Sequence, residues 1–77
     1  MPRARLQIDI EEDKMKELEA LMHDCGIATK RALFNDALTL FKWAVNKRKK
    51  GFQIGAMGPD GRQFTELETP ALSHVCR

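Results

Sequence analysis

One short strand followed directly by two helices is the feature that most constrains this chain. The segment from Arg3 to Ile10 alternates polar and apolar residues at period two, the pattern of a half-buried β-strand, and two helical patterns follow it. A single strand has no sheet to join within this stretch, so its edges must pair with something outside it. The simplest partner is the same strand of a second copy, which predicts an antiparallel ribbon.

The two faces of such a ribbon would differ in chemistry. Residues of alternate parity point to opposite faces of a strand, so one face is apolar and the other polar. The face toward a core carries Leu6, Ile8 and Ile10, and the outward face carries Arg5, Gln7 and Asp9, with Arg3 at the start of the strand.

The length of 77 residues fits one small domain, whose own core gives only marginal stability. The two cysteines, Cys25 and Cys76, are too few for a disulfide framework, so oligomerisation is the expected source of additional stability. We see no signal peptide and no apolar run near the roughly 18 residues of a membrane span. These features predict a soluble, cytoplasmic chain with reduced thiols.

A first helix is predicted over residues 12–25. Acidic residues at its start favour the positive end of the helix dipole, and Gly26 stops it in the left-handed conformation. Apolar residues recur along it at three- and four-residue spacing, and we interpret Cys25 as a small core residue of this stripe. The stripe consists of Met15, Leu18, Leu21, Met22 and Cys25.

A second helix is predicted over residues 30–49, with Thr29 as its N-cap. It is apolar over much of its circumference, and such a helix needs two surfaces to bury it. The first helix covers one side only, so the pattern again predicts a dimer. The residues expected in the dimer core are Leu6, Ile8, Ile10, Leu33, Phe34, Ala37, Leu38 and Phe41; Trp43 is expected to pack at an interface.

Residues 51–77 form a C-terminal arm outside the predicted domain of residues 1–50. Segments 52–57 and 62–67 flank Gly58-Pro59-Asp60-Gly61, which suits a type I turn, so the arm is either a short hairpin or loosely ordered. From Thr69 onward we expect a mobile tail. The arm is expected to add little to the core, although its apolar residues would suit a partner protein.

Charge alternates in blocks along the chain. Residues 11–26 sum to −4 and residues 29–50 to +6, within a net charge of +2. Such a chain can present a basic face without a high overall charge.

The strand, the acidic helix start, the glycine stop, Thr29-Lys30-Arg31 and the apolar second helix together resemble the ribbon-helix-helix DNA-binding family of the Arc and MetJ repressors. The resemblance covers residues 3 to about 48. It implies a mainly α, intertwined homodimer whose antiparallel ribbon lies in the DNA major groove, with four helices as the core.

By this resemblance the outward ribbon residues read base edges. Arg5 can donate paired hydrogen bonds to guanine, and Gln7 can bond adenine. Asp9 departs from the pattern, because a carboxylate only accepts hydrogen bonds and is repelled by phosphate. It can accept from cytosine, pair with Arg5 or Arg3 of the neighbouring strand, or cap the first helix.

The resemblance also implies a phosphate contact at Thr29, Lys30 and Arg31. The physical argument stands alone, because free amides, the positive dipole end and two cations together favour an anion. For Lys47-Arg48-Lys49-Lys50 the simpler interpretation is that cations suit the C-terminal end of a helix.

Metal binding and catalysis are not expected. His23 and Cys25 lie two apart on a helix and point in nearly opposite directions, which argues against a shared metal ion. No arrangement typical of an active site and no cofactor motif occurs in the sequence, so we expect no enzyme and no cofactor.

The predicted function is therefore a sequence-specific transcriptional regulator that binds double-stranded DNA as a homodimer or a higher assembly on DNA. The alternative is an antitoxin-like or other protein-interaction module, in which residues 51–77 bind a partner protein. The two functions are compatible.

Overall fold

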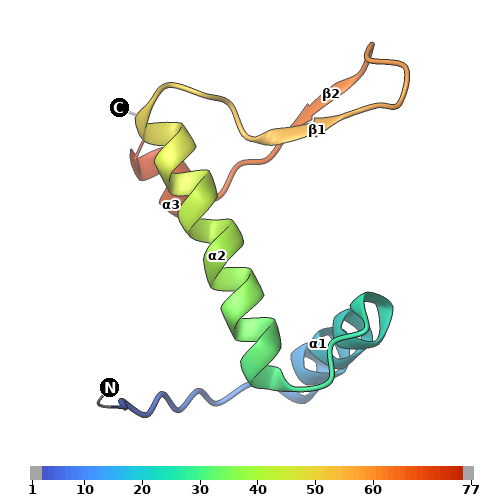
Figure 1. Cartoon of the computed structure of the whole chain (residues 1–77), viewed down its shortest axis with the longest axis vertical. Coiled ribbons are helices and arrows are strands. Elements are labelled where there is room, and N and C mark those ends of the chain that lie inside the picture. Colours follow the sequence, from blue (N-terminus) through green and yellow to red (C-terminus); the bar gives the residue numbers. More distant parts are fainter. Residues whose placement is uncertain (1–2, 76–77) are drawn as a thin grey trace. The chain divides into compact units, whose positions relative to one another are not determined.

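The computed structural model describes residues 3–75 of the chain, which are mainly helical. The elements are α1 (Glu12–Cys25), α2 (Lys30–Lys49), β1 (Gly55–Met57), β2 (Phe64–Glu66) and α3 (Pro70–Val75) (Figure 1). The chain divides into two units, one ending at Leu33 and the other beginning at Phe34. Within the second unit the arm packs on α2.

The strand predicted over residues 3–10 is not formed in the single chain. Residues 3–11 contain neither helix nor strand (Figure 1). Strand hydrogen bonds need a neighbouring strand, and the only sheet in the described part of the chain pairs β1 with β2. The segment therefore leaves its backbone without a ladder partner.

The helix α1 has the range predicted from the sequence. Its N-cap is Glu11, not Asp9, and no side chain caps it. At its end Gly26 adopts a φ of 68°, its N–H donates to His23 O, and Ile27 N–H donates to Met22 O. These two bonds form a Schellman motif, so the glycine stop acts as predicted.

The apolar stripe of α1 is only partly covered. Met15, Leu18 and Met22 are half-buried, whereas Leu21 is exposed, and α1 contains no buried residue. Cys25 is also exposed, so its interpretation as a core residue is wrong for the single chain.

The helix α2 also has its predicted range and its predicted cap. Thr29 Oγ1 accepts a hydrogen bond from Ala32 N at 3.1 Å. The other end closes in a second Schellman motif, in which Phe52 N–H donates to Lys47 O and Gly51, with a φ of 90°, donates to Arg48 O. This motif turns the chain into the arm.

The arm contains a hairpin, so the ordered alternative is confirmed. Strands β1 and β2 are antiparallel, with Gly55 opposite Glu66 and Met57 opposite Phe64. Gly61 N–H donates to Gly58 O at 2.9 Å, closing the turn, and Asp60 Oδ1 accepts from Arg62 N. The φ of Gly61 is 73°, while Pro59 and Asp60 have negative φ, which agrees with the predicted type I turn.

The tail predicted after Thr69 is wrong over residues 70–75, which form α3. Thr69 Oγ1 accepts from Leu72 N at 3.2 Å, and Thr69 O accepts from Ser73 N. Pro70 occupies the first helical position, where its missing N–H costs nothing. The Thr-Pro pair is a helix-start signal that the sequence already contained. Cys76 lies outside the described residues.

The buried core lies in the second unit and draws on three separate elements. Ala44 of α2, Ile54 before β1 and Leu72 of α3 are buried, and Val45 packs against them. The prediction that the arm adds little to the core is therefore wrong, because the arm supplies two of these residues. The apolar residues of the arm are too few and too irregularly spaced to form a helical stripe, so the sequence pattern did not predict that they are buried.

A search of the described helices for a membrane span found none that is both long and apolar enough.

Candidate nucleic-acid interface

The side of α2 predicted to form a dimer core is left open in the single chain. Phe34, Leu38 and Phe41 are between 44 and 48% exposed, and Val45 is half-buried. Their spacing of four, three and four residues places them on one face of the helix. We call these four residues the α2 strip. An aromatic and aliphatic face exposed to this extent is typical of an interface.

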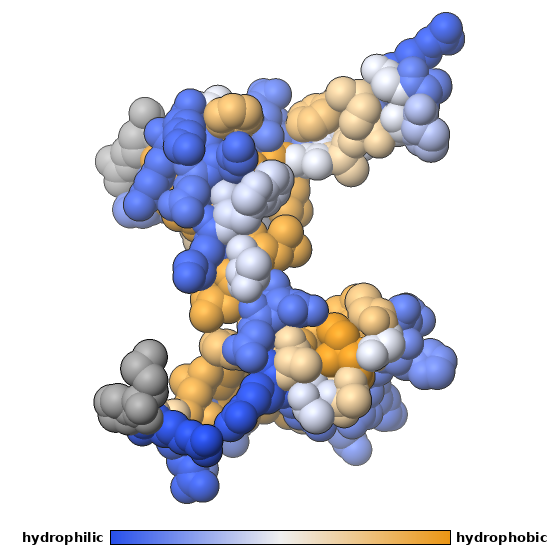
Figure 2. All heavy atoms as spheres, in the orientation of Figure 1, coloured by the Kyte–Doolittle hydropathy of each residue, from blue (hydrophilic) through white to orange (hydrophobic). Residues whose placement is uncertain are grey.

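The other predicted dimer-core residues of α2 are less exposed or smaller. Leu33 is half-buried, and Ala37 is exposed but contributes only a methyl group. The space-filling view shows hydrophobic residues, in orange, exposed among the blue polar residues of the surface (Figure 2).

The apolar residues of the N-terminal segment are likewise exposed. Leu6 is 65% and Ile8 63% exposed, and Ile10 is exposed as well. Arg3, Arg5, Gln7 and Asp9, which alternate with them, are also exposed. The structure thus leaves both the apolar and the polar side chains of this segment exposed and packs neither set against another element.

Asp9 forms no ion pair with the arginines of its own chain. Within residues 3–75 the ion pairs are Lys14–Glu17 and Arg48–Glu66. Of its three predicted roles, the cap is excluded because Glu11 occupies that position. Base contact and pairing with a neighbouring strand both need a second molecule.

The start of α2 presents free backbone N–H groups beside two exposed cations. Thr29 accepts both from Ala32 N through its hydroxyl and from Leu33 N through its carbonyl. The backbone N–H groups of Lys30 and Arg31 lie in the first turn, where a helix provides no partner, and both side chains are exposed. The positive end of the helix dipole disfavours the charges of Lys30 and Arg31, and an anion bound at this end would offset that repulsion.

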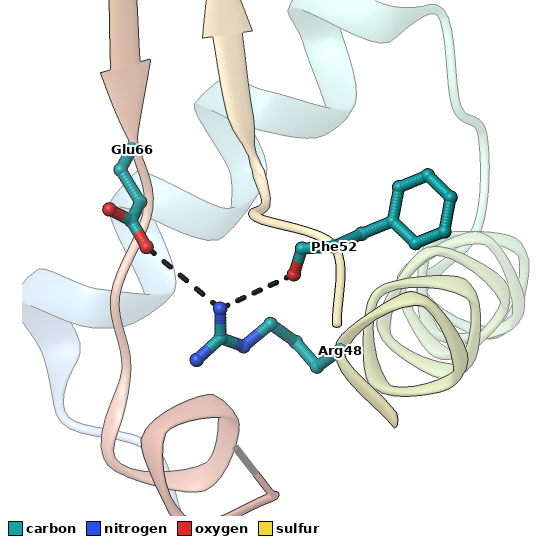
Figure 3. A network of polar contacts seen from close by, with 3 residues as sticks. All are labelled: Arg48, Phe52 and Glu66. Atoms are coloured by element: carbon teal, nitrogen blue, oxygen red, sulfur yellow. Dashed lines mark hydrogen bonds and ion pairs between the residues drawn. The ribbon is translucent and has the colours of Figure 1, made fainter. Parts of the chain in front are cut away.

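The basic residues at the other end of α2 have a structural role. The Lys47 Nζ lies 4.7 Å from the centre of the Phe52 ring. Arg48 Nη1 donates to Phe52 O at 3.3 Å and lies 3.9 Å from Glu66 Oε2 (Figure 3). These contacts join the end of α2 to the arm, a role that was not predicted from the sequence.

An apolar groove that sequence reasoning did not identify lies between the second half of α2 and the arm. Its volume is about 210 Å³. The breadth of the apolar face of α2 was the available signal for it, but the arm residues opposite could not be assigned without the fold. The groove is lined by Ala37, Leu40, Phe41, Trp43, Ala44, Ile54, Leu67, Thr69 and Leu72.

Within residues 3–75 no group of three or more His, Cys, Asp or Glu side chains is placed to hold a metal ion. The pair His23 and Cys25 therefore has no further ligand from the described part of the chain.

Comparisons of this chain with protein-family models, with curated proteins and with solved structures gave no match.

Proposed function

We propose that this chain is a DNA-binding regulator that acts as a homodimer of the ribbon-helix-helix type. The observation that carries the proposal is the exposure of large apolar side chains at two places, the N-terminal segment and the α2 strip. A second copy would cover both at once, by pairing the two N-terminal segments and by packing α2 against α2. Such burial, at about 25 cal/mol per Å², is the main source of stability for an obligate dimer.

Pairing through Leu6, Ile8 and Ile10 would turn Arg5 and Gln7 outward on the opposite face. An antiparallel ribbon fits the major groove, where arginine reads guanine and glutamine reads adenine. The start of α2 supplies a second type of contact, because the free amides of Lys30 and Arg31 and their cations suit a phosphate. Base contacts would give sequence preference, and phosphate contacts would give affinity.

A selection of bound fragments from random DNA, carried out at two salt concentrations, tests this function. A two-fold symmetric dimer should enrich a sequence with two-fold symmetry. The enriched sequence should persist at the higher salt concentration while total binding falls, since phosphate contacts are the salt-sensitive ones. Binding without any enriched sequence would contradict sequence-specific reading.

Binding of a partner protein by the arm is a second candidate function. Met57 and Phe64 lie opposite each other in the hairpin and are both exposed. A two-stranded sheet also leaves backbone groups unpaired at both edges, which a strand of another protein can extend. A dimer that selects no DNA would favour this function over the first.

A further inference from the structure

A row of four residues on α2 is complementary to itself in charge. Asp36, Leu40, Trp43 and Lys47 are spaced by four, three and four residues, so they lie along one face of the helix. We call them the Asp36–Lys47 row. It carries an acid near the start, two large apolar side chains in the middle and a base near the end.

The apolar centre of the row is open. Leu40 is 64% and Trp43 50% exposed, and both line the groove between α2 and the arm. With 3.6 residues per turn, this row lies on roughly the opposite side of α2 from the α2 strip. The row shares no residue with the α2 strip, so the contact that it would make is distinct from the dimer proposed above; Phe41 of the strip reaches the far wall of the groove.

The charged ends of the row do not pair within one chain. Asp36 and Lys47 are about 16 Å apart along the helix axis, too far for contact. Asp36 makes no ion pair within residues 3–75, and the Lys47 ammonium is held beside the Phe52 ring. An ammonium has three donors, so Lys47 can keep this contact and still bind a carboxylate.

We propose that the Asp36–Lys47 row binds the same row of a second copy, with the two α2 helices antiparallel. Positions 36 and 47 are equally far from the middle of the row, and so are positions 40 and 43. A two-fold axis through this midpoint places each Asp36 opposite the partner's Lys47 and each Leu40 opposite the partner's Trp43. The contact is isologous, so two ion pairs flank one apolar centre.

The groove strengthens this assignment to a second copy. Leu40 and Trp43 line the groove of about 210 Å³, so the arm leaves the apolar centre of the row open to a partner. Together with the dimer proposed above, on which this step rests, the second contact joins dimers into larger assemblies.

Complementary charge reversals test the proposal. In Asp36→Lys alone, two lysines face each other at both ends of the contact, and in Lys47→Glu alone two acids do. Each variant should associate roughly tenfold more weakly than the wild type, measured by sedimentation equilibrium. An equal mixture of the two variants should regain wild-type association, because each lysine then faces an acid. Restoration on mixing arises only from contact between different copies.

Trp43 provides a second readout, because it is the only tryptophan. Its fluorescence should shift to shorter wavelength as the wild-type concentration rises, and in the mixture, but less in either variant alone. Lys42→Glu, a reversal outside the row, is the matched control and should behave as the wild type. At about 1 M salt the differences among variants should vanish, because the screening length falls to about 3 Å.

Equal association of both variants and the wild type would overturn the proposal, and so would a mixture that stays weak. Lys47→Glu could lose its helical circular dichroism because Phe52 loses its cation. In that case the association of Asp36→Lys is compared with that of the Lys42→Glu control, and this comparison alone tests the proposal. These measurements need no DNA, and they apply whether the starting species is a monomer or a dimer. Failure of the row is therefore distinguishable from failure of the proposed function.

Discussion

Arg48 of α2 reaches Glu66 of β2 across the junction between the helix and the hairpin, with Nη1 3.9 Å from Oε2 (Figure 3). The Arg48 side chain is only 10% exposed, and its Nε is buried without a hydrogen-bond partner among residues 3–75. Such a guanidinium depends on its remaining acceptors, Phe52 O and Glu66. The pair therefore fixes the arm more than an exposed ion pair would.

Glu66→Gln should lower the free energy of unfolding by about 1 kcal/mol, because a charge-assisted contact to a largely buried cation becomes neutral. Chemical denaturation followed by circular dichroism measures this change. Glu68→Gln, an exposed carboxylate on the same segment, is the matched control and should change stability little. Equal effects of the two variants would show that Arg48 does not need Glu66.

Leu72→Ala should destabilise the second unit by about 2–5 kcal/mol, since Leu72 is 2% exposed and meets Ala44 and Ile54. Met57→Ala, which removes an exposed side chain of the same arm, should cost far less. Thermal melts of both variants provide the comparison. Similar melting temperatures would show that α3 does not dock on α2.

The sequence was sufficient to predict α1 and α2 and left the hairpin as one of two alternatives, but it missed α3 and the core of the second unit. Glycine stops, the Thr29 cap and the turn residues are local signals, and each acts in the structure as expected. The burial of Ile54 and Leu72 depends on contacts with α2 that no periodic pattern encodes. Cys25 is exposed in the single chain: a stripe marks a face of a helix and does not show what covers it.

The proposed interface was predictable only as far as residue type. The alternation of polar and apolar residues placed Arg5 and Gln7 on one face of a predicted strand. The capping residue Thr29 marked the start of the second helix, where Lys30 and Arg31 follow. The N-terminal segment has no strand in the single chain, since no strand within residues 3–75 pairs with it. The groove beside Trp43 was missed because four of its nine lining residues come from the arm.

Leu38→Glu should abolish the dimer, because a charge in the α2 strip would be buried against the partner. Sedimentation should give the mass of a smaller species than the wild type. Asn46→Glu adds the same charge at an exposed position of α2 outside both the strip and the row, and it should leave the dimer intact. A dimeric Leu38→Glu would place the interface elsewhere.

Arg5→Ala should cost about 1–3 kcal/mol on the selected DNA sequence and flatten sequence preference, because the proposed contact of Arg5 with base edges would be lost. Lys30→Ala should weaken binding to all sequences alike. It should also lower the slope of the logarithm of the binding constant against the logarithm of the salt concentration by about one. Fluorescence anisotropy with specific and scrambled duplexes separates the two effects. If Lys49→Ala abolishes binding while Arg5→Ala changes neither affinity nor sequence preference, DNA binds to a different face of the protein from the one proposed.

The three-residue core of the second unit also bears on the kinetics of folding. Ala44, Ile54 and Leu72 all lie within one short stretch of the chain, so bringing them together closes only short loops. The hairpin between them can form within microseconds. The second unit should therefore show a fast refolding phase whose rate is independent of protein concentration, ahead of any slower phase in which two chains must meet.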